Sequence, residues 1–212
     1  MKYAEYIKKI EIDSLWSGRK HIVWNLDRQV NILSGVNGVG KSTILNKLIA
    51  PLKFPNKGEI PHGNGVKIET VPEDATHIRF DVIRSIDRPL INAEIASQLD
   101  FKVATELDLQ IYTLQRRYLD YQVNIANRMI KKKKKKNAPE AQRLSAVKTK
   151  FQDMIDRLFA ETGKTIIRTA NEIRFLQIGE ELTPYQLSSG EKQMLVILLT
   201  VLVEDNKPYL LL

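Results

Sequence analysis

Apolar side chains in the middle of the chain recur at helical spacing and form two stripes. The first stripe is spaced alternately by four and three residues, and it comprises Leu107, Ile111, Leu114, Tyr118, Tyr121 and Ile125. The second stripe alternates in the same way, and it comprises Leu144, Val147, Phe151, Met154 and Leu158. An average spacing of 3.5 residues is typical of helices that pack along a seam, and Pro139 with its polar neighbours separates the two stripes. We therefore predict an antiparallel helical hairpin. Whether its stripes pack only within the protein or also meet a partner stays open.

The segments on either side of this hairpin alternate apolar and polar residues, which is typical of half-buried strands. The expected strands are residues 10–13, 20–26, 29–33, 66–71, 77–83, 165–168, 172–177 and 209–212. Two further helices are expected. One begins at Lys41 and should end near Ala50 because Pro51 follows, and the other is apolar, begins after Ser188 and ends near Val203. This mixture of elements predicts an α/β fold.

The composition is that of an ordinary globular protein. Over 212 residues, 43% are hydrophobic and 27% are charged, which excludes a disordered tail. There are 0 cysteines, so a disulfide scaffold and a thiolate metal site are excluded as well. No apolar run reaches the ~18–20 residues that cross a bilayer, and the N-terminus lacks the apolar core of a signal peptide. We therefore expect a cytoplasmic protein without membrane insertion.

The positive charge is concentrated in one part of the chain. The formal net charge is +8, and residues 100–170 carry 16 Lys and Arg against 8 Asp and Glu, while the remainder is balanced. Six consecutive lysines stand between the two apolar stripes: Lys131, Lys132, Lys133, Lys134, Lys135 and Lys136. They would lie at the tip of the hairpin. Such asymmetry favours an acidic partner, with nucleic acid first; the alternative is a solvated loop tip without a partner.

Residues 35–42 match the phosphate-binding pattern G-x-x-x-x-G-K-[ST]. Glycines such as Gly35 and Gly40 let the backbone wrap tightly, so that successive N–H groups point into one concavity, and the following helix adds its positive end. Lys41 can then reach the β- and γ-phosphates, the Ser42 hydroxyl can ligate Mg²⁺, and Thr43 supports the α-phosphate side. The alternative is an ordinary glycine-rich turn. The motif predicts a site for a nucleoside triphosphate with Mg²⁺.

A second motif spans residues 187–193. Ser188 followed three residues later by Glu191, before an apolar run, is a capping box, and most such boxes only start a helix. Its position roughly 150 residues after the phosphate loop, and shortly before an apolar strand, favours a functional role over a simple helix cap.

Together the two motifs resemble the ATP-binding-cassette (ABC) ATPase superfamily. The residues that carry this resemblance are Gly35, Asn37, Gly38, Gly40, Lys41, Ser42, Thr43, Leu187, Ser188, Ser189, Gly190, Glu191, Lys192 and Gln193. The opening, residues 7–12 and 31–38, is similar to the SMC/RecF/OLD-like branch, whose members act in chromosome maintenance, DNA repair and phage defence, and to stand-alone bacterial "AAA family" ATP-binding proteins. The resemblance implies a P-loop NTPase fold with a β-rich N-terminal part and an inserted hairpin. Residues 1–100 would form the ATP-binding lobe, residues 101–163 the hairpin, and residues 164–212 the return to the core.

The resemblance also implies roles for these residues. Those from Gly35 to Thr43 named above would bind ATP and Mg²⁺, with Lys41 as a catalytic residue and Ser42 as the metal ligand. Ser188, as a second catalytic residue, and Gly190 would touch the γ-phosphate bound by a second subunit, with Ser189 and Glu191 beside them. This arrangement implies an ATP-dependent homodimer.

Several features depart from the usual pattern of the superfamily. Ser189 and Glu191 stand where transporter subunits usually have glycine and glutamine, and no glutamine follows residues 77–83 closely, with Gln98 a poor candidate. Trp16 and Trp24 are interpreted as core residues instead of adenine-stacking ones. The Asp-Glu pair expected after residues 209–212 is not in this chain, so we expect impaired hydrolysis and a missing C-terminal part.

Three functions are weighed on these grounds. The first is an ATPase of DNA maintenance, repair or phage defence, whose hairpin tip engages DNA or a protein effector. The second is the nucleotide-binding subunit of a transporter. The third is a non-hydrolysing module in which nucleotide controls assembly.

Overall fold

A computed structural model describes the chain except for residues 62, 64, 84–88, 90–102, 135–137 and 205–206. Gln98, Lys135 and Lys136 therefore lie outside the described residues. The chain divides into two compact units, each described here by itself. The first comprises Met1–Val82 with Lys207–Leu212, and the second comprises Ile83–Asn206.

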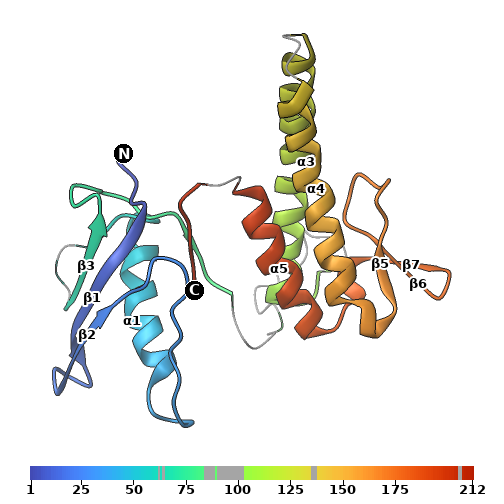
Figure 1. Cartoon of the computed structure of the whole chain (residues 1–212). Coiled ribbons are helices and arrows are strands. Elements are labelled where there is room, and N and C mark those ends of the chain that lie inside the picture. The colour runs from blue at the N-terminus through green and yellow to red at the C-terminus, as the bar shows by residue number, and fades with distance from the viewer. Residues whose placement is uncertain (62, 64, 84–88, 90–102, 135–137, 205–206) are drawn as a thin grey trace. The chain divides into compact units, whose positions relative to one another are not determined.

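The first unit is built on a three-stranded antiparallel sheet in the order β2-β1-β3, with β1 at Tyr6–Leu15, β2 at Lys20–Asn25 and β3 at Val66–Val71 (Figure 1). Ile10 on the central strand is paired with Trp24 on one side and Ile68 on the other. Alternate residues of β1, such as Ile10 and Ile12, are buried together with leucines of helix α1, which spans Lys41–Lys53. The strands predicted at residues 20–26 and 66–71 are thereby confirmed.

Helix α1 continues beyond the predicted end. Pro51 lies inside the helix, which ends at Lys53, and the N–H of Phe54 still donates to the Ala50 carbonyl over 3.3 Å. Leu52 in the added turn is fully buried. A proline removes one N–H donor and strains the preceding turn, and the burial of Leu52 offsets that cost.

The strand predicted at residues 29–33 does not form. Asp27 instead organises a local turn, because its Oδ1 accepts the N–H groups of Gln29 over 2.7 Å and of Val30 over 3.3 Å. The Asn31 side chain exchanges two further hydrogen bonds of 2.8 Å with the Asp27 backbone. Local bonding of this kind competes with strand pairing. The strand predicted at residues 77–83 is shorter in the structure, where β4 spans only Phe80–Asp81. It pairs in parallel with β8, Leu210–Leu211.

Among its described residues, the second unit contains three α-helices and a small antiparallel sheet (Figure 1). The helices are α3 at Glu106–Lys134, α4 at Ala138–Leu158 and α5 at Ser189–Val203. The sheet has the order β5-β6-β7, with β5 at Lys164–Ile166, β6 at Phe175–Gln177 and β7 at Glu180–Leu182. Two 3-10 turns, η1 at Ala160–Thr162 and η2 at Pro184–Gln186, connect these elements. The predicted end of the apolar helix at Val203 is confirmed, while β6 is shorter than the strand predicted at 172–177.

The first apolar stripe is confirmed, because all six of its residues are buried on α3. The second stripe is wrong as a seam. Val147, Met154 and Leu158 are 45%, 41% and 45% exposed, and the Leu144 side chain is outside the described part. Phe151 of the predicted stripe is buried on α4, but the buried face continues through Ile155 and reaches Phe159 directly after the helix.

The shift has a packing cause. The Phe151 ring lies 6.2 Å from the Tyr118 ring of α3, and the Phe159 ring lies 5.4 Å from the Phe175 ring of β6. Helix α4 therefore packs against a helix and a sheet, and its inward face follows the ordinary 3.6-residue period of a globular helix. Whether α3 and α4 form an insert within an ATPase lobe stays a prediction.

Candidate functional site

The phosphate loop is a tight turn that leads directly into α1. Gly38 and Gly40 adopt left-handed backbone conformations, with φ of 83° and 100°, which favour glycine because a side chain would be strained there. The Val39 N–H donates to the Val36 carbonyl over 3.4 Å. Gly40 is the N-terminal cap residue of α1, and its carbonyl accepts the N–H of Ile44 over 3.0 Å.

The N-terminus of α1 is open. No side chain caps it, and its first turn carries no acidic residue. Ser42 and Thr43 are exposed, as are Gly35, Asn37 and Gly38 in the loop before them. The free N–H groups of a first helical turn and the helix dipole make such an end attractive to an anion.

Lys41 places its positive charge in this loop. Its Nζ donates to the carbonyls of Gly35 over 2.7 Å and of Val36 over 3.0 Å, so the loop wraps around the ammonium group. The residues present fit a triphosphate, because an uncapped helix start, a lysine and an exposed hydroxyl follow one another at Gly40, Lys41 and Ser42. The Ser42 hydroxyl is an oxygen ligand of the kind that suits a hard cation such as Mg²⁺.

Trp16 lies beside this loop and is not a core residue as predicted. It is 45% exposed, and a Cβ atom added to Gly40 would come within 2.6 Å of its Cζ2 atom. The backbone of Trp16 has a positive φ of 48°, in the turn between β1 and β2. The adjacent Ser17-Gly18 pair marks this turn in the sequence and could have shown that Trp16 is exposed.

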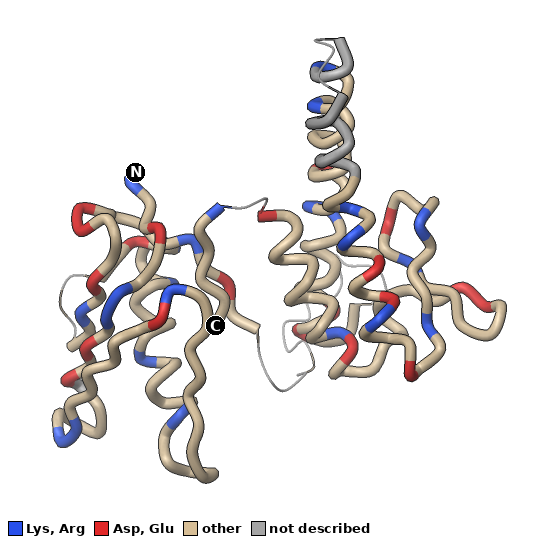
Figure 2. Tube along the Cα trace, in the orientation of Figure 1, with Lys and Arg blue, Asp and Glu red and all other residues tan. Residues whose placement is uncertain are grey.

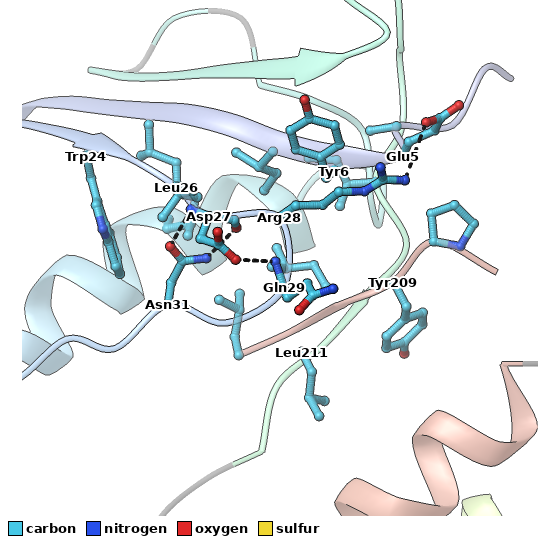
Figure 3. A pocket seen from close by; sticks show the side chains of 18 of the residues that line it. Glu5, Tyr6, Trp24, Leu26, Asp27, Arg28, Gln29, Asn31, Tyr209 and Leu211 are labelled. Carbon is cyan, nitrogen blue, oxygen red and sulfur yellow. Dashed lines mark hydrogen bonds and ion pairs between the residues drawn. The ribbon is translucent and has the colours of Figure 1, made fainter. Parts of the chain in front are cut away.

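A cavity of about 400 Å³ in the first unit is separate from the phosphate loop (Figure 3). Trp24, Leu26 and the turn at Asp27 line it together with Tyr209 and Leu211. None of the residues 35–43 contributes to its wall. Trp24 is half-buried there, which fits its predicted packing role better than an open stacking surface.

The second motif, in the other unit, forms a complete capping box at the start of α5. The Ser188 hydroxyl accepts from the N–H of Glu191 over 3.4 Å, and the Glu191 carboxylate accepts from the N–H and from the hydroxyl of Ser188, each over 2.9 Å. Ser188, Ser189 and Gly190 are exposed. No heavy atom lies within 4 Å of a Cβ built on Gly190. The N-terminus of α5 is thus capped by its own side chains, whereas the N-terminus of α1 has no side-chain cap.

The Glu191 carboxylate is held on its other side by two residues from the small sheet and the turn before it. Its Oε1 accepts from the Thr162 hydroxyl over 2.8 Å and from the Lys164 ammonium over 2.9 Å. Burial raises the pKa of Glu191, but the hydrogen bonds from Ser188, Lys164 and Thr162 together lower it more, to about 2. Glu191 therefore stays ionised and turned inward, although it was predicted to bind the cofactor.

Lys192 also points inward. It is buried, and its Nζ lies 2.8 Å from Asp108 Oδ1 on α3. The other oxygen of Asp108 accepts the N–H groups of Ala104 and Thr105, each over 3.1 Å. The motif thus combines exposed residues at 188–190 with two charged residues that anchor α5 to its neighbours.

Comparison with known proteins places these two motifs in one family. A family model described as "ABC transporter" matches residues 25–212, which include the phosphate loop and the capped start of α5. The chain belongs to this family. No curated protein and no solved structure matches the chain.

Membership of the ABC transporter family makes the chain an ATP-binding, ABC-type ATPase with a P-loop NTPase domain. ABC ATPase domains bind ATP, generally with Mg²⁺, and hydrolyse it, which agrees with the open end of α1. No helix in the described residues is both long enough and apolar enough to cross a membrane. The SMC/RecF/OLD-like branch, the homodimer and the DNA partner stay predictions.

Proposed function

We propose that this ABC-type ATPase belongs to the SMC/RecF/OLD-like branch, pairs around ATP and Mg²⁺, and acts on DNA in maintenance, repair or phage defence. The observation that carries the nucleotide site is the uncapped N-terminus of α1, with Lys41 at its first position. The long helices α3 and α4 support a role beyond nucleotide binding.

In this proposal each residue of the loop has a separate task. The amides at the start of α1 and the Lys41 ammonium hold the β- and γ-phosphates, and the Ser42 hydroxyl ligates Mg²⁺. The exposed ring of Trp16, beside Gly40, offers a face on which the adenine base can stack. Bound Mg²⁺ neutralises charge on the phosphates and orients them.

Ser188 and Gly190 would complete the site of a second copy. Both are exposed at the start of α5, where a hydroxyl and backbone N–H groups can approach an anion. The Ser188 hydroxyl now donates to Glu191, so it would turn from that carboxylate to the phosphate. Glu191 would act as a positioning residue, because Lys164 and Thr162 hold its carboxylate inside.

The proposed DNA contact rests on charge. Figure 2 shows basic residues recurring along the two long helices. Lys131 and Arg116 are exposed on α3, and Lys150 and Arg157 are exposed on α4. Positive charge along an extended surface attracts phosphate backbones without reading sequence. A protein effector with an acidic surface is the alternative for the lysines at residues 131–136.

The test is nucleotide binding by a matched pair of variants, measured by calorimetry with light scattering for mass. Lys41→Ala removes the ammonium from the loop, and Lys47→Ala removes an exposed lysine from the same helix. The wild type and Lys47→Ala should bind ATP with Mg²⁺ and double in mass. Lys41→Ala should lose at least about 100-fold in affinity and stay monomeric, because charge-assisted contacts to phosphate are lost. Equal affinity of both variants would contradict the proposal.

Two other functions are kept for stated reasons. The matching family is described as ABC transporter, so a transporter subunit is the second candidate, and co-purification with a membrane permease would favour it. A non-hydrolysing assembly module is the third candidate, since binding alone can drive pairing, and steady-state ATP turnover by this chain would exclude it.

A further inference from the structure

A small pocket in the second unit lies beside α3 and directly before the start of α5. Its volume is about 180 Å³. Val103, Leu119 and Ile173 form an apolar part of its wall, while Tyr112 and Tyr185 are half-buried at its sides. The nucleotide site described above makes no use of it.

A buried hydrogen-bond donor faces this pocket. Gln115 lines it and is only 9% exposed. Its Oε1 accepts the N–H of Ile173 over 2.8 Å, but its Nε2 makes no hydrogen bond within the described part of the chain. The Nε2 atom is not among the buried atoms that lack a partner, so water in the pocket reaches it, and an acceptor on a ligand that displaces this water can take its hydrogen bond.

The charged residues around the pocket favour an anion. Arg116 lines it and makes no ion pair among the described residues, although its neighbour Arg117 pairs with Glu204. Arg174 lies 3.6 Å from Glu172 and 3.5 Å from Glu181, so its charge is already shared. Glu172 also lines the pocket. Arg116 is therefore the positive charge of the lining that no carboxylate of the described residues neutralises, and a planar guanidinium matches the two oxygens of a carboxylate.

The size of the pocket indicates what carries the carboxylate. Small-molecule sites usually measure roughly 300–1,000 Å³, and this pocket is smaller. It has room for about one side chain. The rings of Tyr112, Pro184 and Tyr185 beside it offer apolar surface to the residues on either side of that side chain.

We propose that this pocket binds the carboxylate side chain of an acidic peptide segment from a protein partner. The carboxylate contacts Arg116 and the Nε2 group of Gln115, and the flanking peptide lies on the tyrosine rings. Pro184 and Tyr185 belong to η2, which is followed by the buried Leu187 and then by Ser188. A bound peptide therefore touches the segment that leads into the motif at the start of α5. This inference goes beyond the proposed function and needs no nucleotide for its test.

The test is an NMR titration of the ¹⁵N-labelled chain with the peptide acetyl-Ala-Glu-Ala-amide. The matched peptide acetyl-Ala-Gln-Ala-amide and glutarate, a carboxylate without a peptide backbone, serve as controls. We expect the glutamate peptide to shift the Gln115 side-chain signals and the amides of Thr183 and Tyr185. Its affinity should exceed that of the glutamine peptide by about tenfold, a difference typical of one charge-assisted contact. It should also exceed that of glutarate, which keeps a carboxylate but lacks the flanking residues that lie on the tyrosine rings.

Three variants separate binding from folding. Arg116→Gln changes an exposed residue and should weaken the glutamate peptide by about tenfold. Gln115→Glu keeps an acceptor for Ile173 but puts a negative charge in the pocket, so binding should be lost. Arg19→Gln removes an exposed arginine of the first unit, outside this pocket, and should leave the affinity unchanged. Equal binding of the two peptides, glutarate binding as tightly as the glutamate peptide, or unchanged affinity in Arg116→Gln would overturn the proposal.

Discussion

At the scale of single residues, the first turns of α1 and α5 differ in whether side chains accept hydrogen bonds from their free N–H groups. Glu191 folds back onto Ser188 and is held by Lys164, whereas α1 has no side-chain cap and no acid in its first turn. A carboxylate at the start of α1 would repel a phosphate. The open helix end is therefore the end that suits an anionic ligand.

Glu191 should make stability depend on pH on the acid side. Its pKa is about 2 in the folded chain, against an ordinary value of 4.5, so the folded state favours the ionised form. The resulting stability is fully present above about pH 4.5 and is lost as the pH falls through about 2. We expect a loss on the order of 1–3 kcal/mol in the free energy of unfolding, measured by urea denaturation at several pH values.

The variant Glu191→Gln should flatten this dependence, because a neutral amide does not titrate. Glu180→Gln, at an exposed position of β7, is the matched control. If Glu191→Gln and the wild type lost stability equally between pH 5 and pH 2, the described role of the carboxylate would be wrong.

At the scale of elements, α4 shows that neighbours select the buried face of a helix. Met154 of the predicted stripe is exposed, while Phe151 of the same stripe and Ile155, outside it, are buried. A helix that packs on α3 alone could keep a 3.5-residue seam. This helix also packs on β5, and its buried face turns accordingly.

The rotated face predicts a large contrast between two residues of α4. Phe151→Ala should lower the free energy of unfolding by about 3–5 kcal/mol, because it leaves a cavity beside Tyr118. Met154→Ala should change it by less than about 0.5–1 kcal/mol, since the side chain is 41% exposed. Thermal or urea unfolding measures both. Similar losses in the two variants would show that Met154 is buried as the sequence pattern predicted.

At the scale of the whole molecule, the excess positive charge belongs to one of the two compact units. The excess of basic residues falls within residues 100–170, and the phosphate loop and the motif at the start of α5 belong to different compact units. The basic segment belongs to the second unit, so a DNA contact there would act on the unit that carries Ser188.

The lysines at residues 131–136 should contribute to the salt dependence of DNA binding. Changing Lys131, Lys132 and Lys133 to glutamine should reduce the slope of log affinity against log salt by up to about 3, because each lost phosphate contact removes roughly 0.9. Fluorescence anisotropy with a 30-base-pair duplex measures it. The same change at Lys8, Lys20 and Lys47, which are exposed in the first unit, should leave the slope unaltered. Equal effects of the two sets would favour the alternative that the lysines form a solvated loop tip without a partner.

The sequence alone determined the features that depend on neighbours within a few residues. Left-handed glycines at Gly38 and Gly40 and the hydrogen bonds between Ser188 and Glu191 need only local chain geometry, and the first stripe needed only its own period. Only the tertiary structure decided which face of α4 is buried, that Trp16 lies against Gly40, and that Gln115 faces a pocket. These features depend on contacts between residues far apart in the chain, whose free energies outweigh local preference and leave little trace in a local pattern.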